Sequence, residues 1–146
     1  HNDIVLMVVG RFELSQIADP GLIEKMKADP AVILTGPQPN VPLYMSLMDV
    51  FVLPAWWEGF GNVLVQAAAM GVPVISTTGT GSRDAVSDGY NGLLVPPKSV
   101  HELVETMDKL YGDKALREEM GRNGLEWAKH FDSPIIWDGM EKLYQE

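Results

Sequence analysis

The sequence contains no cysteine, only three histidines and few positive charges for its length. Without cysteine the chain can form no disulfide bond, no cysteine-ligated zinc site and no catalytic thiolate, and this composition suits a reducing compartment. His1, His101 and His130 stand far apart without the spacing of metal ligands, so we expect no metal site. Eleven Lys and Arg against 20 Asp and Glu give a net charge of −9, which argues against broad nucleic-acid binding because that binding needs a basic face.

Long apolar runs are also missing. No segment has the length of a membrane span, and no basic stretch followed by an apolar one indicates a signal peptide. The content of 46% hydrophobic and 21% charged residues is ordinary for a globular domain, and a length of 146 residues suits one domain. We therefore expect a single domain over residues 1–146, without an internal linker.

Five short aliphatic runs predict β-strands at residues 4–9, 31–35, 50–53, 72–76 and 93–95, and the first of these strands is expected to be buried. Turns rich in glycine and proline end these runs, and helical patterns fill the spaces between them. Strands that alternate with helices through short turns imply parallel βαβ units. The expected fold class is therefore α/β, a doubly wound, Rossmann-like parallel sheet of about five strands with a helical C-terminal tail.

Capping signals mark the starts of several helices. Asp19 followed by Pro20 predicts an N-cap and a proline at the first helical position. In the tail, Ser99 with Glu102 three residues later predicts a capping box, and Asp113 predicts the N-cap of a long helix. The tail after Pro97 is therefore expected to consist of helices without a strand.

Residues 51–71 contain the main candidate for a ligand site. They predict a buried strand that Pro54 closes, a loop over residues 55–62 and a helix over residues 63–70. In an open α/β sheet, ligands bind outside the carboxyl ends of the strands, and the unpaired amides at a helix start suit a phosphate. This predicts a ligand loop; the alternative is an ordinary strand-to-helix turn in which Glu58 is a solvated acid.

A second glycine-bearing loop, residues 77–84, follows the fourth predicted strand and should lie at the same edge of the sheet. Trp56 and Trp57 precede Glu58 in the first loop. Aromatic faces stack on sugars and bases, but a tryptophan beside a strand end is more often partly buried core. We therefore expect one of the two tryptophans to lie in the core.

Residues 54–76 resemble the signature of a known enzyme family. The block from Glu58-Gly59-Phe60-Gly61-Asn62 to Ser76, followed in order by Gly79–Asp84 and Asp88–Pro97, is similar to retaining glycosyltransferases of family 4, the glycosyl transferases group 1 with the GT-B fold. Capsular and exopolysaccharide enzymes of this family resemble it most. The resemblance implies the C-terminal, donor-binding domain of such an enzyme, one half of a GT-B fold. It also implies that the N-terminal acceptor domain and the first strand of this domain are absent, so we expect the isolated chain to be inactive.

The resemblance assigns roles residue by residue. Glu58 matches the first glutamate of the family's Glu-x7-Glu pattern, which implies a catalytic position with contact to hydroxyls of the transferred sugar. The second glutamate of that pattern falls at Gln66. A neutral hydrogen bond in place of a charge-assisted one costs about 1 kcal/mol, or roughly a fivefold weaker ribose contact. The donor-binding residues that the resemblance implies are Gly59, Phe60, Gly61, Asn62, Val63, Gln66, Gly36, Pro37, Gln38, Gly79 and Gly81.

The implied function is retaining transfer of a hexose-type sugar from a nucleotide-diphosphate sugar to a glycan or lipid-linked acceptor in surface polysaccharide biosynthesis. No cofactor is expected beside this donor substrate. A non-catalytic nucleotide-sugar-binding subunit and a GT-B nucleotide-sugar epimerase are the alternatives. The expected partners are the nucleotide sugar and, through the missing domain, the acceptor, with self-association through residues 4–9. The expected location is the cytoplasm, with the inner face of the membrane as the alternative for the full-length enzyme.

Overall fold

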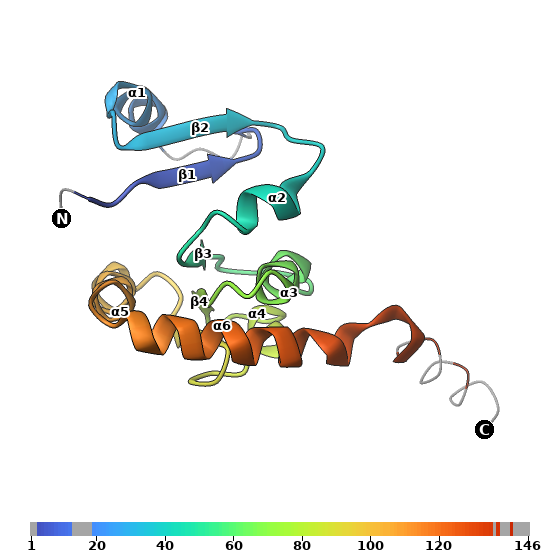
Figure 1. The fold of residues 1–146 in the computed structure, drawn as a ribbon. Coiled ribbons are helices and arrows are strands. Elements are labelled where there is room, and N and C mark those ends of the chain that lie inside the picture. Colours follow the sequence, from blue (N-terminus) through green and yellow to red (C-terminus); the bar gives the residue numbers. More distant parts are fainter. Residues whose placement is uncertain (1–2, 13–18, 136, 138–140, 142–146) are drawn as a thin grey trace. The chain divides into compact units, whose positions relative to one another are not determined.

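A computed structural model describes residues 3–12, 19–135, 137 and 141 of the chain (Figure 1). The chain packs as two compact units, His1–Tyr44 and Met45–Glu146, where the sequence predicts one domain. The strands are β1 (Leu6–Val9), β2 (Val32–Gly36), β3 (Phe51–Leu53), β4 (Val74–Thr77) and β5 (Gly92–Val95). The helices are α1 (Pro20–Ala28), α2 (Val41–Met45), α3 (Asn62–Ala69), α4 (Ser82–Ala85), α5 (Val100–Gly112) and α6 (Lys114–Ala128), followed by the short 3-10 helix η2 (Lys129–Phe131).

The first unit pairs two parallel strands, with Leu6 of β1 opposite Val32 of β2, and α1 packs against β2 (Figure 1). The carboxyl group of Asp19 accepts a hydrogen bond of 2.9 Å from the amide of Gly21, which confirms the predicted N-cap of α1. The prediction that the first strand is buried is wrong, because Leu6 is 49% exposed. In the described chain β1 pairs with one strand alone, and the side chain of Leu6 lies on a face of this two-stranded sheet that the described residues leave partly uncovered.

The second unit is built on three parallel strands with β4 in the centre, where Ile75 lies opposite Val52 of β3 and Leu93 of β5. β4 is buried along its whole length, and Ile75 packs with Leu110 of α5 and Met120 of α6 in the core. All five predicted strands form and every ladder is parallel, so the expected α/β class is confirmed. The hydrogen bonds group the strands as a pair and a triplet, whereas the sequence predicts one sheet.

The helical tail packs closely on α3. A Cβ atom added at Gly124 of α6 would lie 3.1 Å from the carbonyl oxygen of Ala68, and one added at Gly121 would collide with the carbonyl oxygen of Gly71. α3 contacts β3 and β4 of the sheet, and its Ala68 also makes a close contact with α6. The two glycines of α6 therefore let two helices approach at backbone distance.

The caps of the tail helices follow the sequence in part. The carboxyl group of Asp113 accepts from the amide of Leu116 at 2.9 Å, as predicted for the N-cap of α6. The capping box predicted at α5 is wrong, because the hydroxyl of Ser99 donates to the carboxylate of Glu102 at 3.2 Å and caps no backbone amide. A charged acceptor within reach competes with the weaker backbone cap. Within the residues that the structure describes, no helix is long and apolar enough to span a membrane.

Candidate functional site

The two glycine-bearing loops of the second unit lie side by side. β3 and β4 are parallel neighbours, so the loops that follow them leave the same edge of the sheet. A Cβ atom at Gly79 would stand 3.0 Å from the carbonyl oxygen of Trp56, and one at Gly81 would collide with the carbonyl oxygens of Glu58 and Gly59. The predicted proximity of the two loops is therefore confirmed, and glycine is required for the approach.

Two hydroxyl groups at the end of β4 hold this arrangement. The hydroxyl of Thr77 donates to the carbonyl oxygen of Ala55 and accepts from the amide of Gly79 at 3.3 Å, so it contacts both loops. The hydroxyl of Ser76 donates to the carbonyl oxygen of Leu53 at 2.8 Å, and both side chains are buried. These two positioning residues are not among those predicted from the sequence. The available signal was a pair of hydroxyl residues at the end of an otherwise aliphatic strand.

The first loop ends at the start of α3. Gly61 is the N-cap, its carbonyl oxygen accepts from the amide of Leu64 at 2.8 Å, and no side chain caps this helix end in the described residues. The ring of Phe60 packs on Phe131 of η2, with 5.5 Å between the ring centroids. The loop is thus fixed at β4 on one side and at the tail on the other, and the helix start is left without a side-chain cap, as an anion site requires.

Glu58 lies in the first loop, between these two anchors. Its side chain is half-buried, and one carboxylate oxygen accepts from the amide of Gly59 at 3.2 Å. Gln66 is exposed on α3, four residues after Asn62 begins the helix. The structure therefore brings Glu58, Gly59, Gly79 and Gly81 together, with Gly61 to Val63 continuing into the helix that carries Gln66.

Three of the predicted site residues, Gly36, Pro37 and Gln38, belong to the first unit. Gly36 ends β2 with a φ of +66°, and its carbonyl oxygen accepts from the amide of Gly10 at 3.0 Å. Pro37 is exposed. The side chain of Gln38 donates to the carbonyl oxygen of Thr35 and accepts from the hydroxyl of Tyr44, both at 2.8 Å, so it holds its own loop in shape.

The prediction for the paired tryptophans is wrong, because neither lies in the core. Trp56 is 66% exposed and Trp57 is 77% exposed. Other rings form the aromatic packing beside the loop. Phe60 packs on Phe131, and Phe131 packs on Trp127 with 5.8 Å between the ring centroids. The loop therefore presents both indoles to solvent next to Glu58.

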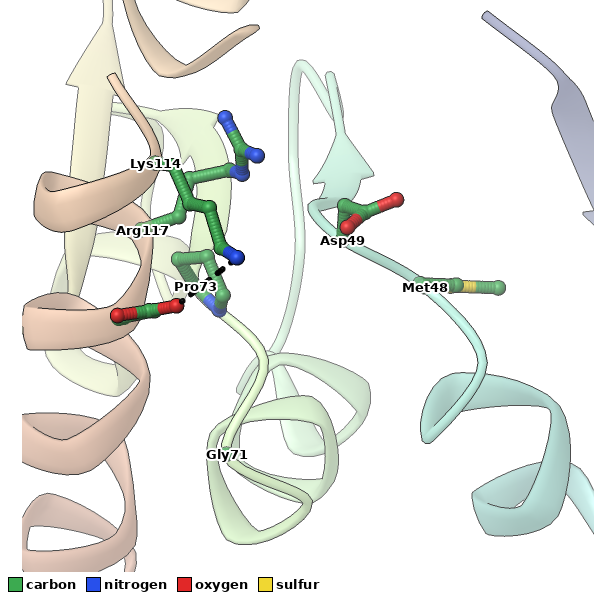
Figure 2. A pocket seen from close by; sticks show the side chains of 7 residues that line it. Met48, Asp49, Gly71, Pro73, Lys114 and Arg117 are labelled. Carbon is green, nitrogen blue, oxygen red and sulfur yellow. Dashed lines mark ion pairs between the residues drawn. The ribbon is translucent and has the colours of Figure 1, made fainter.

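A cavity of about 210 Å³ opens at the other edge of the same sheet, where Asp49 precedes β3 and Pro73 precedes β4 (Figure 2). Three of the charged side chains that line it, those of Lys114, Arg117 and Glu118, make contacts within the protein. Lys114 pairs with Glu118 at 3.6 Å, and Arg117 donates to the carbonyl oxygen of Tyr111 at 2.9 Å at the end of α5. We assign this cavity no ligand. Among the described residues, no three His, Asp or Glu side chains gather as a metal site.

The family of glycosyl transferases group 1 matches residues 1–127. The chain belongs to this family. It is 35% identical over 143 residues to the capsular polysaccharide biosynthesis glycosyltransferase CapM of Staphylococcus aureus, a match that covers 97% of this chain and 38% of CapM. This glycosyl transferase group 1 chain thus spans less than half the length of its curated relative. The family resemblance drawn from residues 54–97 is confirmed.

Solved structures agree with this assignment. HepE of Anabaena, in complex with UDP, superimposes with a TM-score of 0.86 at 23% identity, over 98% of this chain and 41% of HepE. The C-terminal domain of LpcC, a glycosyl transferase group 1 family protein of Francisella tularensis, matches with a TM-score of 0.67 at 29% identity, over 75% of this chain and 59% of that domain. The fold is that of GT-B glycosyltransferases.

Proposed function

We propose that this chain is the donor-binding domain of a retaining glycosyltransferase. The enzyme would transfer a hexose-type sugar from a nucleotide-diphosphate sugar to a glycan or lipid-linked acceptor in surface polysaccharide biosynthesis. The observation that carries the proposal is the backbone contact of two glycine loops around Glu58, at the carboxyl ends of β3 and β4. Ligands bind at such an edge in open α/β sheets. Structures of HepE with UDP and with UDP-glucose support a nucleotide sugar as the ligand.

The start of α3 suits the diphosphate of the donor. The helix dipole favours negative charge at this end, where no side chain caps the helix in the described residues, although the amides of Asn62 and Leu64 donate to the carbonyl oxygens of Phe60 and Gly61. The chain carries a net charge of −9, so local donors of this kind, rather than the overall field, have to hold an anion. In the transfer step, the bond from the anomeric carbon to the phosphate oxygen breaks while the acceptor oxygen bonds to the same face of that carbon. The departing phosphate takes the acceptor's proton, and the amides stabilise the charge that grows on it.

Glu58 and Gln66 would hold the two sugars of the donor. The carboxylate of Glu58 accepts strongly from hydroxyls of the transferred hexose. The exposed amide of Gln66 can bridge the two ribose hydroxyls, because an amide both donates and accepts. Thr77 and the glycines would contribute by holding the loops rigid, since donors that are already oriented need no reorganisation during the reaction.

Calorimetric titration of the chain with UDP and with UDP-glucose tests the proposal. Glu58→Gln should weaken the binding of UDP-glucose about two- to tenfold and leave the binding of UDP unchanged, because its contact is to the hexose. The control is Glu119→Gln, which removes an exposed carboxylate of α6. A parent chain that binds neither ligand would overturn the assignment, and equal losses for both ligands would place Glu58 elsewhere on the donor.

Gln66→Glu probes the departure from the family pattern. We expect UDP to bind a few-fold more tightly to the variant, by about 1 kcal/mol, because a carboxylate accepts more strongly than an amide from the ribose hydroxyls. Equal or weaker binding would mean that position 66 faces away from the ribose. The neutral side chain also favours a second candidate function, a non-catalytic nucleotide-sugar-binding subunit. Restoring the glutamate in the full-length protein would raise transfer in an enzyme and would produce none in such a subunit.

A further inference from the structure

The end of α6 reaches the second glycine loop through one hydrogen bond. The indole nitrogen of Trp127 donates to the carbonyl oxygen of Ala85 at 2.9 Å. Ala85 is buried and ends α4, the four-residue helix into which this loop leads. The last carbonyl groups of a helix have no donor within it, so a donor from outside has to satisfy them. The indole therefore fixes α4, and with it the end of the loop, to α6.

The same tail, formed by α6 and η2, reaches the first glycine loop through aromatic rings. Phe131 packs on Phe60 with 5.5 Å between the ring centroids, and it meets the ring of Trp127 edge-on at 5.8 Å. Tilted and edge-on arrangements are favourable for aromatic pairs. Phe60 directly precedes Gly61, the N-cap of α3, and its carbonyl oxygen accepts from the amide of Asn62 at 2.5 Å. The position of Phe60 thus helps to set where α3 starts, and the two rings of the tail link both loops.

The tail is held firmly at its other end. Gly121 and Gly124 of α6 pack at backbone distance on the end of α3. Further along the tail, Phe131 contacts Phe60, just before the start of α3. The tail therefore spans α3 from its last residues to its first, and the close contacts at one end hold the rings in place at the other. Phe60 is 37% exposed, so its contact with Phe131 lies outside the hydrophobic core.

We propose that Trp127 and Phe131 are positioning residues of the donor site. The inference rests on the proposed function and adds two residues that lie outside both glycine loops. They act on the donor through Ala85 and Phe60, by keeping the loops and the start of α3 in the orientation that binds the diphosphate. A site whose competent conformation is populated only in part binds its ligand more weakly by that fraction. Polar groups that are oriented beforehand also need no reorganisation during the reaction.

Calorimetric titration with UDP and with UDP-glucose tests the proposal, at a temperature well below the unfolding midpoint of each variant. Phe131→Ala should weaken the binding of both ligands roughly three- to tenfold, because they share the diphosphate and the first loop loses the ring that orders it. Phe131→Tyr keeps the ring and should bind like the parent. Trp127→Phe keeps an aromatic ring but removes the N–H group, and it should weaken the binding of both ligands roughly two- to tenfold.

The matched control is Leu125→Ala, which truncates another apolar side chain of α6. Leu125 is 45% exposed and lies beside Gly71, at the end of α3 that is away from the loops. Its truncation should leave both affinities unchanged. Amide hydrogen exchange gives a second readout. In Phe131→Ala we expect a larger increase in exchange at residues 60–63 than in β4, whereas a general loss of stability would raise the exchange in β4 as much.

These measurements separate the inference from the proposed function. Weaker binding of both ligands in Phe131→Ala and Trp127→Phe, with Phe131→Tyr and Leu125→Ala like the parent, supports the positioning role. The inference is overturned if the parent binds UDP and Phe131→Ala binds it equally well. It is equally overturned if Phe131→Tyr or Leu125→Ala weakens binding as much as Phe131→Ala, since the ring contact would then not be the cause. A parent that binds neither ligand counts against the donor site. In that case the exchange at residues 60–63 supports the ordering of the loop by Phe131 if it rises more than in β4, and overturns it if it does not.

Discussion

The hydroxyl of Thr77 forms hydrogen bonds to both glycine loops. Removing this one group should therefore weaken the hold on both loops. Thr77→Val keeps the shape of this buried side chain but leaves the partly buried carbonyl oxygen of Ala55 without its donor. We expect the free energy of unfolding to fall by about 1–3 kcal/mol. Urea unfolding measures this, and Thr80→Val, at an exposed position of the same loop, is the control that should stay within about 0.5 kcal/mol of the parent.

Gly81 has both a positive φ and no room for a side chain, whereas Gly89 has a positive φ alone. Gly81 has a φ of +81°, and an added Cβ atom would meet the backbone of Glu58 and Gly59. Gly89 has a φ of +75° with open space around it. Gly89→Ala should therefore cost about 1–2 kcal/mol for its left-handed backbone, and Gly81→Ala about 2–5 kcal/mol because overpacking is added. If thermal unfolding shows the same loss of stability for Gly81→Ala and Gly89→Ala, the two glycine loops of the site can move apart at little cost, which would contradict this prediction.

At the scale of elements, the close approach of α3 and α6 requires glycine in α6, although glycine has a low helix propensity. Alanine stabilises a helix interior by about 1 kcal/mol relative to glycine, yet Gly121→Ala should destabilise the protein by up to about 2 kcal/mol, because the new methyl group meets the carbonyl oxygen of Gly71. Gly112→Ala at the end of α5, where nothing lies within 4 Å of the added atom, should stabilise it by about 0.5 kcal/mol. Opposite signs in urea unfolding are the expected result, and a stabilising Gly121→Ala would contradict the observed packing.

Elements with local signals could be predicted from the sequence, and contacts between distant residues could not. Asp19 and Asp113 cap α1 and α6 through bonds to amides two and three residues away, so their patterns suffice. The proximity of the glycine loops followed from strand order alone. The exposure of Trp56 and Trp57 depends on which rings occupy the space beside the loop, and those rings come from η2 and α6, some 70 residues later. The hydroxyl of Thr77 likewise finds its partner 22 residues back along the chain.

At the scale of the whole molecule, the edge of β1 provides a route to self-association. In the described residues β1 pairs with β2 alone, and Leu6 is 49% exposed. An apolar strand edge invites pairing with a second copy, and a lysine on the edge opposes it. We expect light scattering over a dilution series to show association of the chain that Leu6→Lys weakens several-fold. Leu22→Lys on α1, at a position 52% exposed, should not. A parent that is monomeric at every concentration would contradict this prediction.

The distribution of tryptophans has an optical consequence. Three of the four indoles are largely exposed, whereas Trp127 is half-buried and donates from its indole nitrogen to the carbonyl oxygen of Ala85 at 2.9 Å. The native fluorescence should therefore be red-shifted and readily quenched by acrylamide, as in an unfolded chain, although the protein is folded. Intensity changes at Trp56 and Trp57 would then report occupancy of the loop without any attached dye, while the emission maximum would be a poor measure of folding.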